Sequence, residues 1–336
     1  MKKFFAAVLA LVMMLSLVAC GGGSSSSGGE SSGGSEAITL KIQGAWAETD
    51  SNMRAVPDFC AKVAEKSGGT LNVEWGGGPE AIPQNQQTEA LKNGIVDIVW
   101  TCHTYMSSHI SVLAGMKLTI PSEMRTNGGQ EFVDKLYQEN LNGARYLGAV
   151  CDGLTYNLYS KEPVSSLEDF KGLTFRATPA YQAFVEALGA GAANMDPGDA
   201  YQALENNVIQ GYGWPSVGVK DYAWQEVSKY IIEPAFYTTD TCILISGKAW
   251  SKLNETQQNA LLEAAQEIEA EAKDYYAEAV AADHEALVAE GMEIIELPAD
   301  VAEEYLNIAN KAAWDLVVAN DAENAKTLMG YTSYKG

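Results

Sequence analysis

The residue whose position first indicates chemistry is an arginine at the end of a short strand-like run. Arg176 follows Leu173-Thr174-Phe175 in GLTFRATPAYQAF, and Thr178-Pro179 is a typical helix start. In parallel α/β sheets, ligands bind beyond the carboxyl ends of strands, where helix N-termini offer free N–H groups and partial positive charge. A guanidinium there adds a planar pair of donors that suits a carboxylate. Position alone leaves two interpretations open, a carboxylate-binding arginine or a surface arginine paired with one of many acids.

Motifs for other chemistry are missing from the sequence. It contains no Gly-x-Ser-x-Gly, His-Glu-x-x-His, P-loop or dinucleotide fingerprint, and GGGPEAIPQ, which begins at Gly76, is read as a turn. His103 and His109 lack the spacing of a metal site, so we expect them to be exposed or singly hydrogen-bonded. The cysteines after Cys20 show no Cys-x-x-Cys spacing. We expect buried thiols, with a bridge between Cys102 and Cys151 possible in an exported protein.

The N-terminal segment predicts export and a lipid anchor. Lys2 and Lys3 precede an apolar run that is too short for a membrane-spanning helix, and the run ends in Leu-Val-Ala-Cys20. This ending resembles a bacterial lipobox, so residues 1–20 are predicted to be a lipoprotein signal peptide and Cys20 the lipidated residue. An ordinary secretory signal is the alternative. Residues 21–36 are almost entirely Gly and Ser, which predicts a flexible tether.

The charge of the chain excludes several partners. The formal net charge is −22 at pH 7, and cleavage of the signal peptide would remove two lysines. Nucleic-acid binding and a polybasic membrane-binding surface both require clustered positive charge. We therefore expect no nucleic-acid partner, and membrane contact through the lipid anchor alone.

The mature chain alternates between strand and helix patterns. Strands are predicted at residues 38–42, 70–75 and 95–100, with helices at 51–66 and 83–93 between them. This order predicts a largely parallel sheet with helices on its faces. EALKNGIVDIVW, which ends at Trp100, is echoed by QALENNVIQGYGW, which ends at Trp214. About 300 residues exceed a usual single core, so two similar α/β lobes are expected.

A long helix is predicted near the C-terminal end. Residues 255–290 contain no Gly or Pro, Asn254 and Gln257 resemble a capping box, and Gly291 is a natural stop. A continuous helix of thirty-six residues would be about 54 Å long and would lie across both lobes. The competing possibility is a break near Asp283-His284.

Several segments together resemble the solute-binding receptors of tripartite ATP-independent periplasmic (TRAP) transporters. The most specific is SSLEDFKGLTFRATPAYQAFVEALGA, which carries the family's Asp-x-x-Gly-x-x-x-Arg run and its Leu-Gly-Ala helix end. AYQALENNVIQG is similar to a second family segment, although Gln210 replaces the usual Asp, and ISGKAWSKLNETQQNALLEAA is similar to a strand–helix joint. The resemblance covers about residues 38–316 and includes the long helix.

The resemblance implies a two-lobed periplasmic-binding-protein fold with a hinge and a long helix that spans both lobes. Lobe 1 is then expected at 37–154 plus about 240–270, and lobe 2 at 155–239 plus about 271–330. The family's signature arginine, which pairs with the ligand carboxylate, is similar in position to Arg176, and a second signature position falls on Trp214. A family branch with Trp here holds a metal ion through a preceding Glu. Gly213 stands there in this chain, so neither a metal nor another cofactor is expected.

Further ligand-binding candidates follow from the resemblance and from position. Thr155 and Asn157 lie where that branch places a ligand-contacting Gln. Trp46 and Tyr105 follow strands where lobe 1 would face the cleft, and Tyr237 follows a strand in lobe 2. Aromatic residues at such positions either contact a ligand or fill a core.

These observations predict a lipid-anchored extracytoplasmic receptor that captures an organic acid anion and delivers it to the membrane permease subunits of a TRAP transporter. Two alternatives stay open. One is a surface lyase or hydrolase acting on an organic acid, for which no base–nucleophile pair is evident. The other is a ligand-sensing lipoprotein that uses the same cleft.

Overall fold

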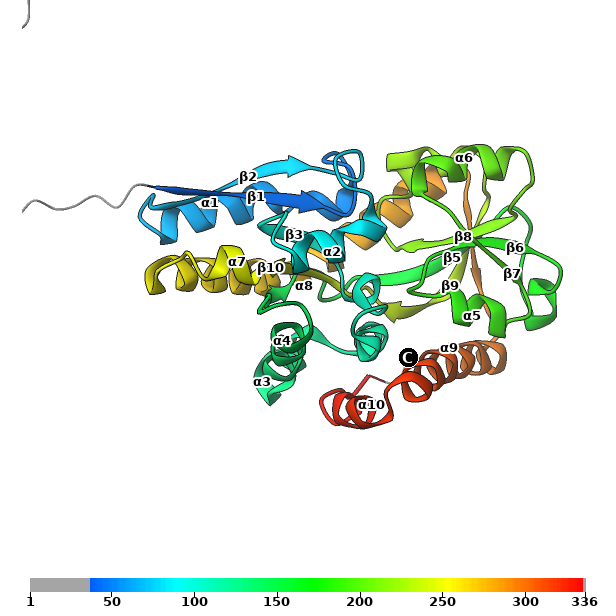
Figure 1. Cartoon of the computed structure of the whole chain (residues 1–336). Coiled ribbons are helices and arrows are strands. Elements are labelled where there is room, and N and C mark those ends of the chain that lie inside the picture. The colour runs from blue at the N-terminus through cyan, green and yellow to red at the C-terminus, as the bar shows by residue number, and fades with distance from the viewer. Residues whose placement is uncertain (1–36, 335–336) are drawn as a thin grey trace, which may run out of the picture. The chain divides into compact units, whose positions relative to one another are not determined.

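The computed structural model describes residues 37–334, which contain two β-sheets (Figure 1). The N-terminal 36 residues, including Cys20 and the Gly/Ser segment, lie outside the described residues. No described helix is both long enough and apolar enough to cross a membrane.

The first sheet has five strands in the order β2-β1-β3-β10-β4. β1 pairs in parallel with β2 and β3, whereas β10 is antiparallel to both of its neighbours, β3 and β4. The strands are β1 (Ile38–Gly44), β2 (Leu71–Gly77), β3 (Ile98–Cys102), β4 (Arg145–Ala149) and β10 (Thr241–Ile245).

The second sheet has six strands in the order β11-β9-β5-β8-β6-β7. β6 is parallel to β7 and β8, β9 is parallel to β11, and β5 runs antiparallel to β8 and β9. The strands are β5 (Thr155–Ser160), β6 (Thr174–Ala177), β7 (Gly191–Asn194), β8 (Gly211–Pro215), β9 (Tyr230–Thr238) and β11 (Glu293–Glu296). The prediction of largely parallel sheets is therefore wrong in part, since each sheet contains strands in both directions.

The chain crosses between the sheets more than once. It passes from β4 to β5, returns from β9 to β10, and reaches the second sheet again at β11. We call the first sheet with its helices lobe 1 and the second sheet with its helices lobe 2. β10 lies next to β3 and β4 although about 90 residues separate it from β4 in the sequence, because its alternate faces carry fully buried apolar side chains.

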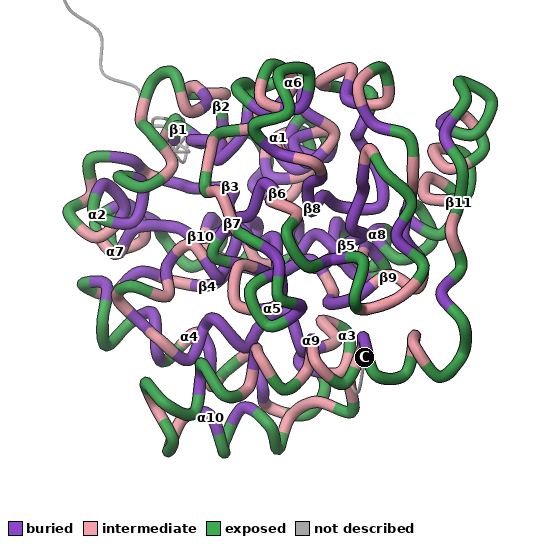
Figure 2. The backbone as a smooth tube through the Cα atoms, turned by 90° about the vertical axis from the view of Figure 1, so that its right-hand side faces the viewer, coloured by how far each residue is buried: buried purple, intermediate pink, exposed green. Residues whose placement is uncertain are grey.

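Helices cover the sheets, and their apolar faces are buried while their outer faces are exposed (Figure 2). In α1 (Val56–Lys66), Val56, Phe59 and Val63 are buried at helical spacing. The other helices are α2 (Gln87–Lys92), α3 (Pro121–Asn127), α4 (Gly129–Asn140), α5 (Gln182–Ala187), α6 (Pro197–Glu205), α7 (Gly247–Trp250), α8 (Glu255–Ala289), α9 (Ala299–Asn320) and α10 (Ala322–Met329).

Short 3₁₀ helices make up many of the connections. They are η1 (Ser51–Met53), η2 (Gln84–Gln86), η3 (His103–Met106), η4 (Ser111–Leu118), η5 (Leu167–Phe170), η6 (Val219–Tyr222) and η7 (Trp224–Glu226). The predicted helix start at Thr178 is wrong, because α5 begins only at Gln182. Thr178-Pro179 instead form a turn in which the Tyr181 and Gln182 amides donate to the Thr178 carbonyl.

The long helix is continuous. α8 has 35 residues, a length of about 52 Å, and no break at Asp283-His284. Asn254 and Gln257 form the predicted capping box, with reciprocal bonds of 3.0 and 3.1 Å. Its N-terminal half packs on α1 and β4 of lobe 1. Past its C-terminal end, Glu290 pairs with Lys220 of lobe 2, so the helix connects both lobes.

The apolar interior is also shared. One cluster of buried side chains contains Ile42, Ile98 and Trp100 from lobe 1 together with Tyr212 and Trp214 from lobe 2. All four cysteines in the described part of the chain are free, and Cys102 and Cys151 are both buried. Burial raises the pKa of the Cys151 thiol to about 12. These thiols are therefore apolar core groups at neutral pH.

Candidate functional site

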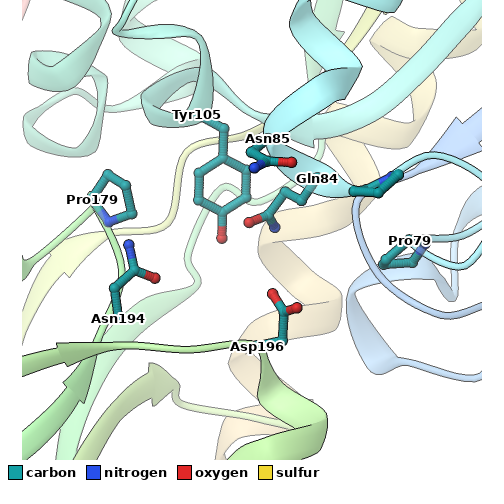
Figure 3. A pocket seen from close by; sticks show the side chains of 8 residues that line it. Pro79, Gln84, Asn85, Tyr105, Pro179, Asn194 and Asp196 are labelled. Atoms are coloured by element: carbon teal, nitrogen blue, oxygen red, sulfur yellow. The ribbon is translucent and has the colours of Figure 1, made fainter.

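A pocket with a volume of about 450 Å³ lies between the two lobes (Figure 3). Lobe 1 contributes a loop after β2, η2 and η3, and lobe 2 contributes the segments that follow β6 and β7. The lining side chains comprise three amides, three prolines, one phenol and one carboxylate. They are Pro79, Pro83, Gln84, Asn85, Tyr105, Pro179, Asn194 and Asp196. The volume is in the range typical of small-molecule sites.

Arg176 lies on β6, three residues before the lining Pro179, and is not itself one of the lining residues. Only 3% of it is exposed. Its Nε donates to the Met195 carbonyl at 3.2 Å, and Nη1 donates to the Tyr181 hydroxyl at 2.8 Å and the Gly213 carbonyl at 3.4 Å. These neutral acceptors fix the plane of the guanidinium and leave its charge uncompensated.

No carboxylate within residues 37–334 forms an ion pair with Arg176. This is unusual in a chain with 44 acidic and 22 basic residues. A buried charge without a counter-charge costs free energy, which an anion entering from outside would offset. The arrangement therefore favours binding of an anion next to Arg176.

Tyr181 connects Arg176 to β8. Its hydroxyl accepts from Arg176 and donates to the Gly213 carbonyl at 2.5 Å. Its ring also occupies the space beside Gly213, where a Cβ atom would lie 2.4 Å from the ring carbon Cε2. A glutamate at position 213 would therefore clash with Tyr181. In the described part of the chain, no group of three or more His, Cys, Asp or Glu side chains gathers that could hold a metal ion.

Aromatic rings enclose the guanidinium on another side. The Arg176 Cζ lies 5.2 Å from the ring centroid of Trp214 and 5.9 Å from that of Trp224. Trp214 meets Trp224 and Tyr222 edge to face, with centroids 4.8 and 5.4 Å apart. These contacts are within cation–π range and keep water from the charge. The buried Nε1 of Trp214 has no hydrogen-bond partner among residues 37–334.

Two of the predicted lobe 1 residues meet at the opposite wall. Tyr105 lines the pocket, and its ring centroid lies 6.2 Å from that of Trp46. Burial raises the pKa of the Tyr105 phenol well above its ordinary value, and the charge of Arg176 opposes this shift. The phenol is therefore a neutral hydroxyl at physiological pH, able to donate to a ligand oxygen.

The other three predicted residues make contacts within lobe 2. Asn157, which pairs in register with Trp214, donates to the Ile232 carbonyl at 3.0 Å and accepts from Ser216 Oγ at 2.6 Å. Thr155 Oγ1 lies 3.0 Å from Ser216 Oγ.

Tyr237, the last of these, packs against Phe236 and Phe184, and its hydroxyl donates to the Ala309 carbonyl. Of the predicted ligand-binding residues, Tyr105 lines the pocket, whereas Arg176, Trp214, Trp46, Asn157, Thr155 and Tyr237 are not among its lining residues. Ligand contact stays a prediction for all of them.

Sequence reasoning missed most of the pocket lining. Gln84 and Asn85 lie in residues 83–93, for which the sequence predicts only a helix, and Asp196 before Pro197 has the residue type typical of a helix cap. Asp196 does occupy the N-cap position of α6, but its side chain makes no capping hydrogen bond. A signal for Asn194 and Asp196 was present, since Asn194 ends β7, which runs parallel to β6, and Asp196 follows it.

The lobes are joined at the rim by direct hydrogen bonds. The Ser51 amide donates to Asp221 Oδ2 at 2.9 Å, and the Tyr222 hydroxyl donates to Asp50 Oδ2 at 2.6 Å. Asp50 is 3% exposed, and burial raises the pKa of its carboxyl. These bonds connect η1 of lobe 1 with η6 of lobe 2, so the structure is in a state in which the lobes contact each other.

Two α/β lobes around a central pocket, a shared long helix and a buried arginine without a counter-ion define the class of solute-binding receptors. The chain belongs to bacterial extracellular solute-binding protein family 7, whose family model matches residues 42–320. The predicted family, TRAP solute-binding receptors, and the two-lobed fold are thereby confirmed. The protein is a receptor and not an enzyme.

Known relatives agree with this assignment. A solute-binding protein of Chromohalobacter salexigens is 25% identical over 262 residues, which are 73% of this chain and 75% of the relative. A TRAP solute-binding protein of Roseobacter denitrificans with bound L-galactonate has a TM-score of 0.73 at 22% identity, covering 88% of this chain and 99% of that one. One from Desulfovibrio salexigens with bound orotic acid has a TM-score of 0.78 at 18% identity, covering 87% and 97%.

Proposed function

We propose that this protein is an extracytoplasmic, lipid-anchored receptor that captures an organic acid anion and delivers it to the membrane permease of a TRAP transporter. The observation that carries the proposal is the buried Arg176, which has no carboxylate partner within the described chain and whose charge acts on Tyr105, a residue of the pocket wall. A ligand carboxylate would supply the missing counter-charge through a charge-assisted hydrogen bond.

The structural neighbours support an acidic ligand. Proteins of this fold have been solved with L-galactonate, D-glucuronate and β-D-galacturonate, each of which carries one carboxylate. Trp214 and Tyr105 are the further residues proposed to contact the ligand, since the Trp214 ring lies within cation–π range of Arg176 and Tyr105 lines the pocket. The ring of Trp46 packs against that of Tyr105, and we propose that it helps to position Tyr105.

The lobes are proposed to open and close about the segments that cross between the sheets. We assign residues 37–154 and about 240–270 to lobe 1, and 155–239 and about 271–330 to lobe 2. The distribution of strands between the two sheets supports this division. The rim bonds Ser51–Asp221 and Asp50–Tyr222 would form on closure and stabilise the closed state.

Binding is tested by screening the protein against a panel of mono- and dicarboxylates, 2-oxo acids and aromatic acids by thermal shift. We expect at least one acid to raise the melting temperature and to be recovered chemically unaltered by mass spectrometry. A panel without any binder would contradict the proposal, and so would recovery of a converted product.

The anchor is tested separately, because it depends on residues outside the described part of the chain. Replacing Cys20 with Ser should abolish lipid labelling and release the protein from membranes or block its processing. Lipid labelling that persists in Cys20→Ser would contradict the anchor without affecting the binding proposal.

A further inference from the structure

A free carboxylate faces the pocket from the same lobe that holds Arg176. Asp196 is the N-cap of α6, a position where aspartate usually accepts a hydrogen bond from the helix backbone. Here the side chain makes no such bond, and it projects into the pocket toward the wall that carries Gln84 (Figure 3). Within residues 37–334, Asp196 has no ion-pair partner. The side chain therefore presents its acceptors to whatever occupies the pocket.

The positions of the two charges are linked. The Arg176 Nε donates to the carbonyl of Met195, the residue immediately before Asp196. β6, which carries Arg176, pairs in parallel with β7, and Asp196 follows the end of β7. Both charges therefore come from adjacent strand ends of one rigid sheet, and their separation does not depend on how far the lobes close.

The remaining polar groups are bifunctional. Gln84, Asn85 and Asn194 carry amides, which both donate and accept, and Tyr105 carries a hydroxyl. Pro79, Pro83 and Pro179 form stiff apolar parts of the wall. A pocket with several amides suits a ligand that bears several hydroxyl groups, since each hydroxyl can donate to one amide and accept from another.

A carboxylate in such a pocket discriminates between ligands by charge. An aspartate carboxylate accepts hydrogen bonds but donates none. A ligand hydroxyl or ammonium would donate to it, whereas a second ligand carboxylate would be repelled. Charge complementarity therefore requires one anionic end, at Arg176, and one donor end, at Asp196.

We propose that Asp196 is a specificity-determining residue that selects monocarboxylates with a hydrogen-bond donor remote from the carboxylate and rejects the corresponding dicarboxylates. This inference rests on the proposed function, because it assumes that a ligand carboxylate binds at Arg176. It assigns the ligand to the polar monocarboxylic acids, with hydroxyl groups as the principal donors.

The test uses pairs of acids that differ only at the far end. L-Galactonate and D-gluconate are compared with galactarate and D-glucarate, in which the terminal CH₂OH is a second carboxylate. We expect the wild-type protein to bind a monocarboxylate at least tenfold more tightly than its dicarboxylate counterpart. Asp196→Asn removes the charge and keeps a good N-cap residue, so the fold should be unaffected.

In Asp196→Asn, affinity for the monocarboxylate should fall about 10- to 100-fold, the loss typical of a hydrogen bond to a charged group. Affinity for the dicarboxylate should rise. The matched control is Asp199→Asn, which removes the same charge from the first turn of α6 at a position that does not line the pocket, and it should change neither affinity.

Each other outcome counts against the role of Asp196, and the last one counts against the receptor function as well. Wild-type binding of a dicarboxylate at least as tight as that of its monocarboxylate would overturn the role of Asp196 while supporting the receptor function. An unchanged affinity ratio in Asp196→Asn would do the same. If no acid in these pairs or in the wider panel binds, the receptor function fails, and the role of Asp196 fails with it.

Discussion

Arg125 and Arg176 lie in two different regions of the molecule and have opposite environments. Arg125, on α3, forms two short bonds to Glu269 of α8, at 2.5 Å from Nε and 2.7 Å from Nη2. Glu269 also accepts from the Ala149 amide at 3.0 Å. Arg176 is more deeply buried, yet its bonds go to two carbonyls and a phenol. One guanidinium has its counter-ion within the chain, and the other does not.

The difference separates a structural arginine from a binding arginine more clearly than burial does. A planar donor fork with a built-in carboxylate fixes a helix against a strand. The same fork held in place by neutral acceptors keeps its charge available to an external anion. The comparison therefore predicts that the two arginines affect different properties when they are removed.

The largest expected effect is that of Arg176→Ala on ligand affinity. Loss of one partner of a buried charge pair typically costs about 2–5 kcal/mol, roughly 30- to several-thousand-fold in affinity. Calorimetry with the tightest-binding acid of the panel measures it. Arg176→Lys should restore only part of the affinity, because an ammonium keeps the charge but not the fork. Wild-type affinity in Arg176→Ala would show that the arginine does not bind the ligand.

Arg125→Ala should show the reverse pattern, with an effect on stability and none on affinity. Glu269, whose side chain is 6% exposed, would lose its counter-charge. Breaking buried pairs costs about 3–5 kcal/mol, and because 23% of the Arg125 side chain is exposed we expect about 2–3 kcal/mol of unfolding free energy.

Urea denaturation measures the stability of Arg125→Ala, and titration of the same acid measures its affinity. The double variant Arg125→Met, Glu269→Met removes both charges and should regain part of the lost stability. A loss of affinity in Arg125→Ala comparable to that in Arg176→Ala would remove the distinction between the two regions.

Lys117 sharpens the comparison, because it is a third buried cation, 1% exposed, that does not face the pocket. Its ammonium donates to the Ala180 carbonyl, and Nζ lies 4.9 Å from the ring centroid of Tyr237. Burial lowers the pKa of Lys117 from 10.5 to about 8, and the charge of Asp240 opposes this shift.

The last expected effect follows from this pKa. Between pH 8 and 10.5 the unfolded chain holds a proton on Lys117 that the folded chain has released, so the contribution of Lys117 to stability rises with pH in this window. Below pH 8 its unfavourable contribution is constant. The free energy of unfolding of the wild-type protein, measured by urea denaturation, should therefore rise relative to that of Lys117→Met between pH 8 and 10.5. A constant difference across this range would contradict the assigned pKa.

The sequence predicted those elements whose patterns are local. α8 was predicted to within a residue at its C-terminal end because Asn254, Gln257 and Gly291 carry cap chemistry that acts over a few residues. β1, β2 and β3 likewise have alternating or continuous apolar runs. The insertion of β10 between β3 and β4 depends on pairing between distant segments, which no local pattern specifies.

The same division applies to the site. Arg176 could be found because its strand-end position and a family motif coincide. Tyr181 could not, since its role depends on the space that Gly213 leaves on a strand about 30 residues later. Asp196 has the residue type and spacing of a helix cap, and only the geometry shows that its side chain is not used for that role.

The strand order has a consequence for the sequence of events during synthesis. β4 pairs only with β10, so the first sheet lacks its connection to β4 until Ile245 has emerged from the ribosome. Five of the six strands of the second sheet lie between residues 155 and 238, and the sixth, β11, is at an edge. Since contacts close in sequence form faster than distant ones, the lobe encoded later has a nearly complete sheet before the lobe encoded first. Lobe 1 can therefore complete its sheet only after β10 has been synthesised, which follows the last of these five strands in the chain.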